Sequence, residues 1–402
     1  MALIELDHVT TIFGRDDKAA LAKVKAGMGK VELLEQTGHT LGLHDVSMDI
    51  EAGEIFVVMG LSGSGKSTLV RHINRLIDPT GGEVRIDGEN ILALSPKALI
   101  DLRRRRIAMV FQRFGLLPHR RVLDNIAYGL EIRGVARKER EATARDWLGR
   151  VGLEGYEASY PGALSGGMQQ RVGLARALAS DTDIILMDEA FSALDPLIRS
   201  ELQDELVRLQ RATGKTVVFI THDLDEALRL ADRIAILKDG QLVQLGTPND
   251  ILLRPADAYV EAFVRDVNRA RALTVDTLKQ PPALRITEET IAEALAVMRQ
   301  TRTEVGYVIE DGRYTGVVTR ASLEEAGAST ATAASLSEPQ PGIAADMPIE
   351  TALPTLLDAQ HPVAIVNGSG ELTGIVHQKD VSDVLNPGRG AVAPPEDERP
   401  AT

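Results

Sequence analysis

The stretch Gly60–Thr68, GLSGSGKST, restricts the fold of this chain more than any other segment. It matches the pattern G-x-x-x-x-G-K-[ST] and lies between an apolar run, EIFVVMG, and a helical pattern that begins at Lys66. Glycines let the backbone wrap around phosphates, and backbone N–H groups and a helix N-terminus stabilise their charge. The sequence therefore predicts a nucleotide-binding loop, the alternative being a flexible turn. The predicted nucleotide contacts are Gly60, Leu61, Ser62, Gly63, Ser64, Gly65, Lys66, Ser67 and Thr68.

Within this loop, two side chains have distinct expected roles. Lys66 would reach the β- and γ-phosphates, and the hydroxyl of Ser67 would bind Mg²⁺. The expected ligands are therefore ATP and Mg²⁺.

Short apolar runs alternate with helical patterns from about residue 53 to residue 244. EIFVVMG, RIAMVFQ, DIILMDE, TVVFITH and RIAILK are nearly continuous in apolar residues, which is typical of strands buried on both faces. Helical patterns such as 66–77 and 199–212 separate them, so we expect an α/β fold with a mainly parallel sheet. Ligands of such sheets bind beyond the carboxyl ends of the strands, where Gly60, Gln112, Glu189 and His222 fall.

Two adjacent carboxylates, Asp188 and Glu189, end the run IILMDE. Asp188 suits the shell of a Mg²⁺ ion bound to a triphosphate, and Glu189 would orient and polarise the attacking water. The alternative is that both acids only end a strand at the surface. Gln112 could contact Mg²⁺ or water, and His222 could bond the γ-phosphate; the alternative for each is a polar residue with ordinary partners.

Composition excludes several classes of function. The chain has 402 residues, enough for two or three domains, and a formal charge of −13, which argues against a broad basic nucleic-acid-binding face. The basic run 103–106 is interpreted as a solvated helix end rather than a nucleic-acid or lipid contact. The absence of cysteine excludes disulfides and cysteine-bound zinc. No apolar run approaches the ~20 residues of a membrane span, and residues 1–14 lack a signal-peptide core, so any membrane role would require a partner.

Several segments lie outside the alternating pattern. Residues 16–40 form a polar, Ala- and Lys-rich insert that could be helical, and 249–271 resembles a helical connector. The remainder contains an internal repeat with a shift of 58 residues, as in Gly316 and Gly374. We expect one repeat at 272–330 and the other at 331–386, packed as a pair. The tail, 387–402, is rich in Pro and Gly and acidic, and is expected to be disordered.

The motifs GLSGSGKST, VFQ, LSGGMQQR, LMDEAFSALD and THD, in this order, resemble those of an ABC ATPase, namely Walker A, Q-loop, signature, Walker B with D-loop, and H-loop. The resemblance implies a P-loop NTPase nucleotide-binding domain at 1–248, with a RecA-like core and a helical subdomain at about 113–180. It also implies a homodimer, in which the signature of one chain closes over ATP held by the other. The signature residues that would meet the γ-phosphate in this way are Ser165, Gly166, Gly167 and Gln169.

Two further roles are implied by the same resemblance. Asp195 would lie along the dimer seam. Phe13 stands where the family places an aromatic ring against adenine, and base–aromatic stacking tolerates such a residue; the alternative is that Phe13 packs in the core.

The runs EAFSALDPLIR and MVFQRFGLLPH, together with the insert, resemble the ATPases of glycine betaine/proline (quaternary amine) importers. The repeats, YVIEDGRYTGVVTR and AIVNGSGELTGIVHQKD, resemble the cystathionine β-synthase (CBS) domains that regulate that family. The resemblance implies integral-membrane permease subunits, one of whose coupling helices docks near Gln112. It also implies a substrate-binding protein, acting indirectly, and a peripheral location on the cytoplasmic face of the membrane. The alternatives are import of another solute, such as an amino acid, and a soluble ABC switch without a permease.

The CBS-like repeats depart from the nucleotide-binding pattern G-h-h-[ST]-x-x-D. The first copy has Gly316 and Thr319 but Ser322 at the acidic position. The second has Asp380, but His377 stands at the hydroxyl position. A regulatory role is expected, whereas an adenosine ligand, a cyclic dinucleotide, ionic strength and support of the dimer alone remain alternatives.

Overall fold

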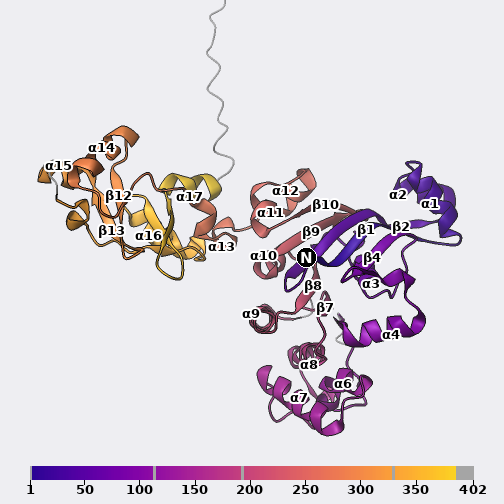
Figure 1. Ribbon diagram of the computed structural model, residues 1–402. Coiled ribbons are helices and arrows are strands. Elements are labelled where there is room, and N and C mark those ends of the chain that lie inside the picture. The colour runs from indigo at the N-terminus through magenta and orange to yellow at the C-terminus, as the bar shows by residue number, and fades with distance from the viewer. Residues whose placement is uncertain (1, 112–114, 192–193, 328–330, 386–402) are drawn as a thin grey trace, which may run out of the picture. The chain divides into compact units, whose positions relative to one another are not determined.

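The computed structural model describes residues 2–111, 115–191, 194–327 and 331–385 (Figure 1). Its contacts divide the chain into two units, Met1–Asp266 and Val267–Thr402. The predicted disordered tail and Gln112 lie outside the described residues.

A six-stranded sheet forms the centre of the first unit, in the strand order β10-β9-β3-β8-β7-β6. All neighbouring pairs are parallel except β9 and β10, and every residue of β3 and β8 is buried. The five apolar runs thus form the five parallel strands, and the predicted parallel sheet is confirmed. The strands are β3 (Ile55–Met59), β6 (Ile107–Val110), β7 (Ile184–Asp188), β8 (Thr216–Thr221), β9 (Arg233–Lys238) and β10 (Gln241–Gly246).

A second, antiparallel sheet has the order β2-β1-β4-β5 and was not among the expected elements. Buried and less buried residues alternate along much of β2, the pattern of a strand with one face toward the core. Apolar residues of both sheets share one core with α3 (Lys66–Ile73), including Ile4, Leu43, Phe56 and Leu69. The strands are β1 (Ala2–Phe13), β2 (Thr40–Glu51), β4 (Gly81–Ile86) and β5 (Glu89–Asn90).

The polar insert contains two helices, α1 (Asp17–Lys25) and α2 (Lys30–Thr37), between β1 and β2. Val24 and Leu33 pack with Ile12 and Leu41 at the adjoining strand ends. The insert therefore has a small apolar core of its own, continuous with the antiparallel sheet.

The remaining helices of the first unit include a group, α5 to α8, whose members pack on one another (Figure 1). Two helices differ in length from expectation: α3 ends at Ile73, and α9 begins at Pro196, where Asp195 caps it. The helices are α4 (Pro96–Arg105), α5 (Val122–Ile126), α6 (Tyr128–Ile132), α7 (Arg137–Arg150), α8 (Gly166–Ala179), α9 (Pro196–Thr213), α10 (Leu224–Leu230), α11 (Pro248–Leu253) and α12 (Ala258–Val264), with short 3₁₀ turns at Ile91–Ala93 and Pro161–Ala163.

The second unit contains two copies of one motif, each with a three-stranded sheet, in the orders β11-β12-β13 and β14-β15-β16. The first copy has β11 (Arg285–Ile286), α14 (Ile291–Thr301), β12 (Val305–Glu310), β13 (Arg313–Thr319) and α15 (Arg320–Ala326). The second has β14 (Ile343–Ala344), α16 (Ile349–Asp358), β15 (Val363–Val366), β16 (Leu372–Val376) and α17 (Gln378–Leu385). Helix α13 (Arg269–Ala272) and the 3₁₀ turn Val275–Leu278 precede the first copy, and the 3₁₀ turn Ala333–Leu336 precedes the second.

The segments before the two copies are exchanged. Gln280, ahead of the first copy, exchanges two backbone hydrogen bonds of 2.8 Å with Ile375 in β16. Glu338, ahead of the second copy, does the same with Val317 in β13, at 2.8 and 3.0 Å. The sheet of each copy therefore pairs with the segment that precedes the other copy in the sequence.

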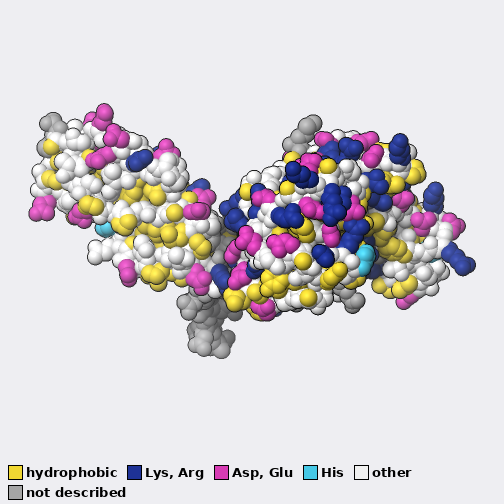
Figure 2. Space-filling model, turned by 90° about the horizontal axis from the view of Figure 1, so that it is seen from below, with side chains coloured by type: hydrophobic (Ala, Val, Ile, Leu, Met, Phe, Trp, Pro, Cys, Tyr) yellow, Lys and Arg dark blue, Asp and Glu magenta, His cyan; other side chains and the backbone are white. Residues whose placement is uncertain are grey.

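On the face seen in Figure 2, Lys and Arg side chains are interspersed with Asp and Glu over the first unit. Among the described residues, no helix combines the length and the apolar character needed to cross a membrane.

Candidate nucleotide site

The glycine-rich loop runs from the end of β3 to the start of α3, as its sequence predicts. Gly60 and Gly65 have φ angles of 147° and 103°, a region that residues with a Cβ rarely occupy. A Cβ on Gly65 would lie 2.7 Å from the carbonyl oxygen of Gly42, and one on Gly60 would collide with the carbonyl oxygen of Leu237. Glycine is thus required at both positions for the backbone to lie close to its neighbours.

Lys66 is the charged group inside this loop. It is only 6% exposed, and its Nζ donates to the carbonyl oxygens of Gly60 and Leu61 at 2.8 and 3.0 Å. Burial lowers the pKa of Lys66, while the nearby carboxylates of Glu189 and Asp188 oppose that shift. The ammonium is therefore held inside the loop by two carbonyl oxygens, which carry no full charge.

Ser67 and Asp188, far apart in the sequence, meet at the end of the parallel sheet. The Ser67 hydroxyl donates to Oδ1 of Asp188 at 3.1 Å. A hydroxyl and a carboxylate are oxygen ligands of the kind that Mg²⁺ prefers. The pair fits the metal proposed from the sequence, and Thr68 follows in the first turn of α3.

Glu189 and His222 directly follow the neighbouring strands β7 and β8. Their side chains approach to 3.5 Å between Oε1 of Glu189 and Nδ1 of His222. Glu189 has a positive φ of 46°, and its backbone N–H donates to the carbonyl oxygen of Ile220 at 3.2 Å. The turn after β7 therefore directs the carboxylate toward His222, whose side chain is 59% exposed.

The signature stretch begins α8, with Ser165 as its N-cap and Gly166 and Gly167 in the first turn. The Ser165 hydroxyl accepts from the N–H of Met168 at 3.4 Å, and Gln169 donates to the carbonyl oxygen of Leu164 at 3.2 Å. Whereas α8 packs on α5, α6, α7 and β6, the loop helix α3 packs on β2, β7 and β8. The two glycine-rich helix starts therefore belong to different packing layers of the first unit.

Asp195 lies near the signature glycines rather than in the glycine-rich loop. It caps α9 by accepting from the N–H of Ile198 at 3.1 Å, and it lines a pocket of about 460 Å³ with Ser165, Gly166 and Gly167.

Phe13 ends β1 with its ring across Gly42, because a Cβ on that glycine would lie 2.6 Å from Cε2 of Phe13. The carbonyl oxygen of Gly42 in turn faces Gly65 of the loop. Phe13 is 42% exposed and so does not belong to the buried core. The ring therefore lies beside the start of α3 and is partly exposed.

Sequence reasoning missed two contacts of this site. Tyr259, in α12, accepts a hydrogen bond from the loop N–H of Leu61 at 3.5 Å. Arg199, in α9, contacts both the loop before that helix and the residues around His222. Neither residue lies in a motif with a mechanism attached, and the pairings exist only in the folded chain.

These features together define an ATP-binding cassette. They are a strand followed by a glycine-rich loop with a buried lysine, a Ser–Asp pair, a Glu–His pair and a second glycine-rich helix start. The ABC transporter family model matches residues 43–192, and the CBS domain model matches 279–328 and 335–386.

Curated relatives match nearly the whole chain. The glycine betaine/proline betaine transport system ATP-binding protein ProV of Salmonella typhimurium is 46% identical over 95% of this chain and 97% of its own length. The glycine betaine transport ATP-binding protein OpuAA of Bacillus subtilis is 46% identical over 93% of this chain and 90% of its own. A trimethylamine N-oxide transport system ATP-binding protein, TmoW of Ruegeria pomeroyi, is 52% identical over 69% of this chain and 81% of its own.

A solved dimeric ATP-binding cassette in a post-hydrolysis state, bound to ADP and Pi, is 34% identical and has a TM-score of 0.52. That match covers 61% of this chain and 98% of the solved one. The chain belongs to the family of ABC transporter ATP-binding subunits that includes ProV and OpuAA and couples ATP hydrolysis to transport.

Proposed function

We propose that the chain is the ATP-hydrolysing subunit of an importer for glycine betaine and related quaternary amines such as proline betaine. The observation that carries the proposal is the 46% identity to ProV over 95% of the chain, which includes the CBS-like repeats as well as the cassette. A relative sharing only the cassette would support ATP hydrolysis without favouring one solute.

In this proposal the loop Gly60–Thr68 holds the triphosphate, with Lys66 facing the β- and γ-phosphates. Ser67 and Asp188, together with Gln112, hold Mg²⁺, which when bound supplies positive charge to the phosphate oxygens. Glu189 orients the attacking water and accepts its proton, and His222, 3.5 Å from Glu189, holds the γ-phosphate and the water in line. Phe13 stacks on adenine with its exposed face.

The proposed active form is a homodimer. Ser165, Gly166, Gly167 and Gln169 of one copy would meet the γ-phosphate held by its partner, with Asp195 along the seam. The different packing layers of α3 and α8 support this arrangement, as does the dimeric state of the similar solved cassette. Loss of the γ-phosphate after hydrolysis would remove the group that bridges the two copies.

A pocket of about 450 Å³ on the first unit is the proposed docking place of a permease coupling helix. Residues of α4, β6, α6 and α8 line it, and Ile100 and Ile132 on its wall are 46% and 39% exposed. Arg103, Arg104 and Arg176 add positive charge. A pocket lined by apolar residues and arginines suits an amphipathic helix with acidic residues. The chain would then be peripheral, on the cytoplasmic face of the membrane, and a substrate-binding protein would deliver the solute to the permease.

The CBS-like pair is proposed as a regulator of hydrolysis. The pattern residues are engaged within the chain: the Thr319 hydroxyl accepts from the N–H of Ser322 at 3.1 Å, and the Asp380 carboxylate accepts from the N–H of His377 at 3.2 Å. These contacts cap the helices that follow β13 and β16. Because the pattern residues already have partners within the chain, we favour a signal other than adenosine binding, such as ionic strength.

The decisive experiment uses membrane vesicles that contain the chain, its permease and its binding protein. We expect ATP-driven uptake of labelled glycine betaine that an excess of unlabelled proline betaine suppresses. Trimethylamine N-oxide is the second solute to test, because TmoW is 52% identical over 69% of this chain. Uptake of an amino acid but of no methylated amine would overturn the proposed substrate. Purification from membranes without any integral-membrane protein would support a soluble switch instead.

A further inference from the structure

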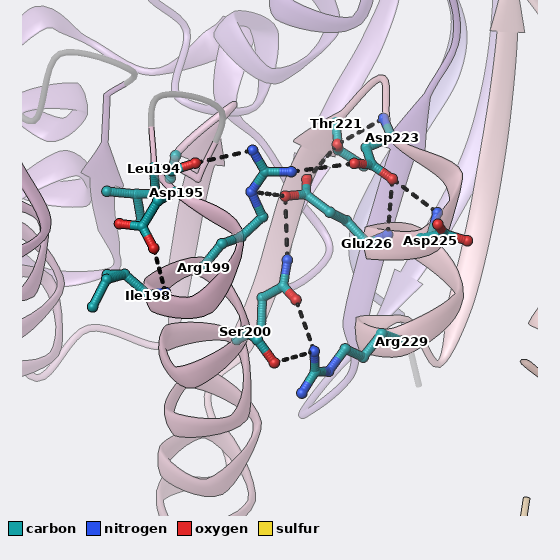
Figure 3. A network of polar contacts seen from close by, with 12 residues as sticks. Leu194, Asp195, Ile198, Arg199, Ser200, Thr221, Asp223, Asp225, Glu226 and Arg229 are labelled. Carbon is teal, nitrogen blue, oxygen red and sulfur yellow. Dashed lines mark hydrogen bonds and ion pairs between the residues drawn. The ribbon is translucent and has the colours of Figure 1, made fainter. Parts of the chain in front are cut away.

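A polar network joins the start of α9 to the residues around His222 (Figure 3). Its centre is Arg199, in the first turn of α9. The guanidinium donates through Nη2 to the carbonyl oxygen of Leu194 at 3.2 Å and through Nη1 to Oδ2 of Asp223 at 3.4 Å. Its Nε also forms an ion pair of 3.6 Å with Oε1 of Glu226. One planar group thus contacts the loop before α9 and both the loop and the helix after β8.

Glu226 is the residue of α10 that Arg199 contacts. It is 6% exposed, accepts from the hydroxyl of Thr221 at 2.6 Å and accepts from Nε2 of Gln203 at 3.2 Å. Burial raises the pKa of this carboxyl, and the hydrogen bond from Thr221 is the main opposing influence, followed by the charge of Arg199. A buried carboxylate needs such donors, because an unpaired one is costly in the interior.

His222 lies between the two residues that the network holds. On one side, Thr221 donates to Glu226 and also accepts from the N–H of Asp223 at 3.0 Å. On the other side, Asp223 accepts from Arg199 and caps α10 through the N–H of Asp225 at 3.0 Å. Hydrogen bonds therefore fix the residues on both sides of His222. The imidazole itself is 59% exposed and lies 3.5 Å from Glu189.

The same guanidinium reaches the loop that carries Asp195. Leu194, whose carbonyl oxygen accepts from Arg199, directly precedes Asp195 in the chain, and Asp195 caps the helix on which Arg199 lies. A displacement at Asp195 would change the position of Arg199, and with it the hydrogen bond to Asp223 and the ion pair with Glu226.

We propose that Arg199 and Glu226 are positioning residues for hydrolysis, which set the distance of His222 from Glu189 in response to the position of Asp195. The inference rests on the proposed function, in which His222 aligns the γ-phosphate and water, and it adds the link from the dimer seam to that alignment. Because reaction rates depend steeply on the geometry of the reacting groups, loss of this link should act on turnover rather than on ATP binding.

The structure offers a matched control for a purely architectural role. Arg229, in α10, also ties α9 to α10, donating to Ser200 at 2.7 Å and to Asp204 at 2.6 Å. In the described part of the chain its third hydrogen bond goes to Oε1 of Gln203, also in α9, at 3.5 Å, and none goes to Leu194 or Asp223. Arg199→Met and Arg229→Met therefore each remove a guanidinium between the same two helices, but only the first acts on the two loops.

The test compares kcat for ATP, affinity for a fluorescent ATP analogue and thermal stability in the full-length protein. We expect Arg199→Met to lower kcat about tenfold or more, with analogue affinity within about twofold of wild type. Arg229→Met should retain wild-type kcat. In a His222→Ala background, Arg199→Met should cause little further loss, because residues that act through one another are not additive.

Equal losses of kcat in the two arginine variants would show that the contact is architectural and would overturn the proposal. An undiminished effect of Arg199→Met in the His222→Ala background, or a parallel loss of affinity, would do the same. If Arg199→Met does not fold, Thr221→Val and Thr221→Ser replace it. Thr221→Val removes the hydroxyl between Glu226 and Asp223 and should lower kcat. Thr221→Ser keeps that hydroxyl and should have the kcat of the wild type. Absence of hydrolysis in the wild type would instead count against the proposed function, so the two failures are distinguishable.

Discussion

The ammonium of Lys66 lies in the interior, with two carbonyl oxygens of its own loop as hydrogen-bond partners. Carbonyl dipoles hold the group in place but do not cancel its charge, and burial lowers its pKa although the carboxylates of Glu189 and Asp188 oppose that shift. A bound triphosphate would supply the missing negative charge. We infer that the loop is preorganised for an anion, and that nucleotide binding favours the protonated lysine.

Glu189→Gln is the sharpest single change at the proposed site. Glutamine keeps the size of the side chain and its contact with His222 but cannot accept a proton from water. We expect hydrolysis to fall about 100-fold or more, while ATP and Mg²⁺ hold the protein as a dimer. Size-exclusion chromatography with and without ATP, together with phosphate release, measures both effects. Glu205→Gln, which removes a carboxylate paired with Arg208 on α9, is the control and should behave as wild type. Normal hydrolysis by the Glu189 variant would reject the assignment.

His72 is fully buried behind the glycine-rich loop, and it should make stability depend on pH. Its Nδ1 donates to the carbonyl oxygen of Ile77 at 2.8 Å, so its Nε2 accepts from the hydroxyl of Thr11 at 2.6 Å. Burial lowers the pKa of His72 below the ordinary value of 6.5. The unfolded chain therefore binds a proton that the folded chain resists, and the contribution to stability is present above about pH 6.5 and lost as the pH falls below it.

We expect the free energy of unfolding to decrease between about pH 6.5 and pH 5 more steeply in the wild type than in His72→Gln. Urea denaturation of both proteins at each pH gives the difference between their free energies of unfolding. Exposed histidines such as His8 are present in both proteins, so their contributions cancel in that difference. A difference that is constant with pH would show that His72 does not titrate in this range.

At the scale of elements, the exchanged segments make the two CBS-like copies depend on each other. Gly316 in β13 and Gly374 in β16 occupy matching positions, where the crossing segments press against the strands. A Cβ on Gly374 would lie 3.1 Å from the carbonyl oxygen of Gln280, and one on Gly316 would collide with the carbonyl oxygen of Glu338. These glycines therefore serve close backbone approach, a structural role that the nucleotide-binding pattern alone does not reveal.

Gly316→Ala should destabilise the whole second unit by about 1–3 kcal/mol, because the added methyl group has no room beside Glu338. Gly368→Ala is the control, since a Cβ there meets nothing within 4 Å. Hydrogen exchange of β12 and β15 measures the effect in both copies at once. Loss of protection in the first copy alone would contradict the mutual dependence.

The sequence predicted the parallel sheet and which candidate site residues lie at the ends of its strands, but not the architecture around them. Phosphate and metal chemistry restrict residue types at short spacing, so Lys66, Ser67, Asp188 and Glu189 could be proposed as site residues without a structure. The antiparallel sheet, the exchange through Gln280 and Glu338, and the contacts of Arg199 depend on residues far apart in the chain. Each such residue has several possible partners in a single sequence, and only tertiary packing selects one.

At the scale of the whole molecule, the contact boundary after Asp266 falls inside the predicted connector. Helix α12 belongs to the first unit, where Tyr259 accepts from Leu61 of the glycine-rich loop and donates to the carbonyl oxygen of Leu237 at 3.4 Å. Helix α13 instead packs on α16 and α17 in the second unit. The few residues between α12 and α13 therefore connect a helix that contacts the nucleotide loop with a helix that belongs to the CBS-like pair.

This arrangement determines where the chain should be cut to test regulation. A chain ending at Asp266 retains α12 and its contact with the loop, whereas a cut at Leu273 would leave α13 without α16 and α17, with Ala270 exposed. We expect the chain ending at Asp266 to hydrolyse ATP at about the full-length rate in low salt, because the proposed site lies within the first unit. Added salt screens charges over about 8 Å at physiological ionic strength, so a charge-based signal from the second unit should vanish with that unit. Assays of both chains across salt concentrations, with Gly368→Ala as a control, measure the difference, and identical salt curves would reject regulation by ionic strength.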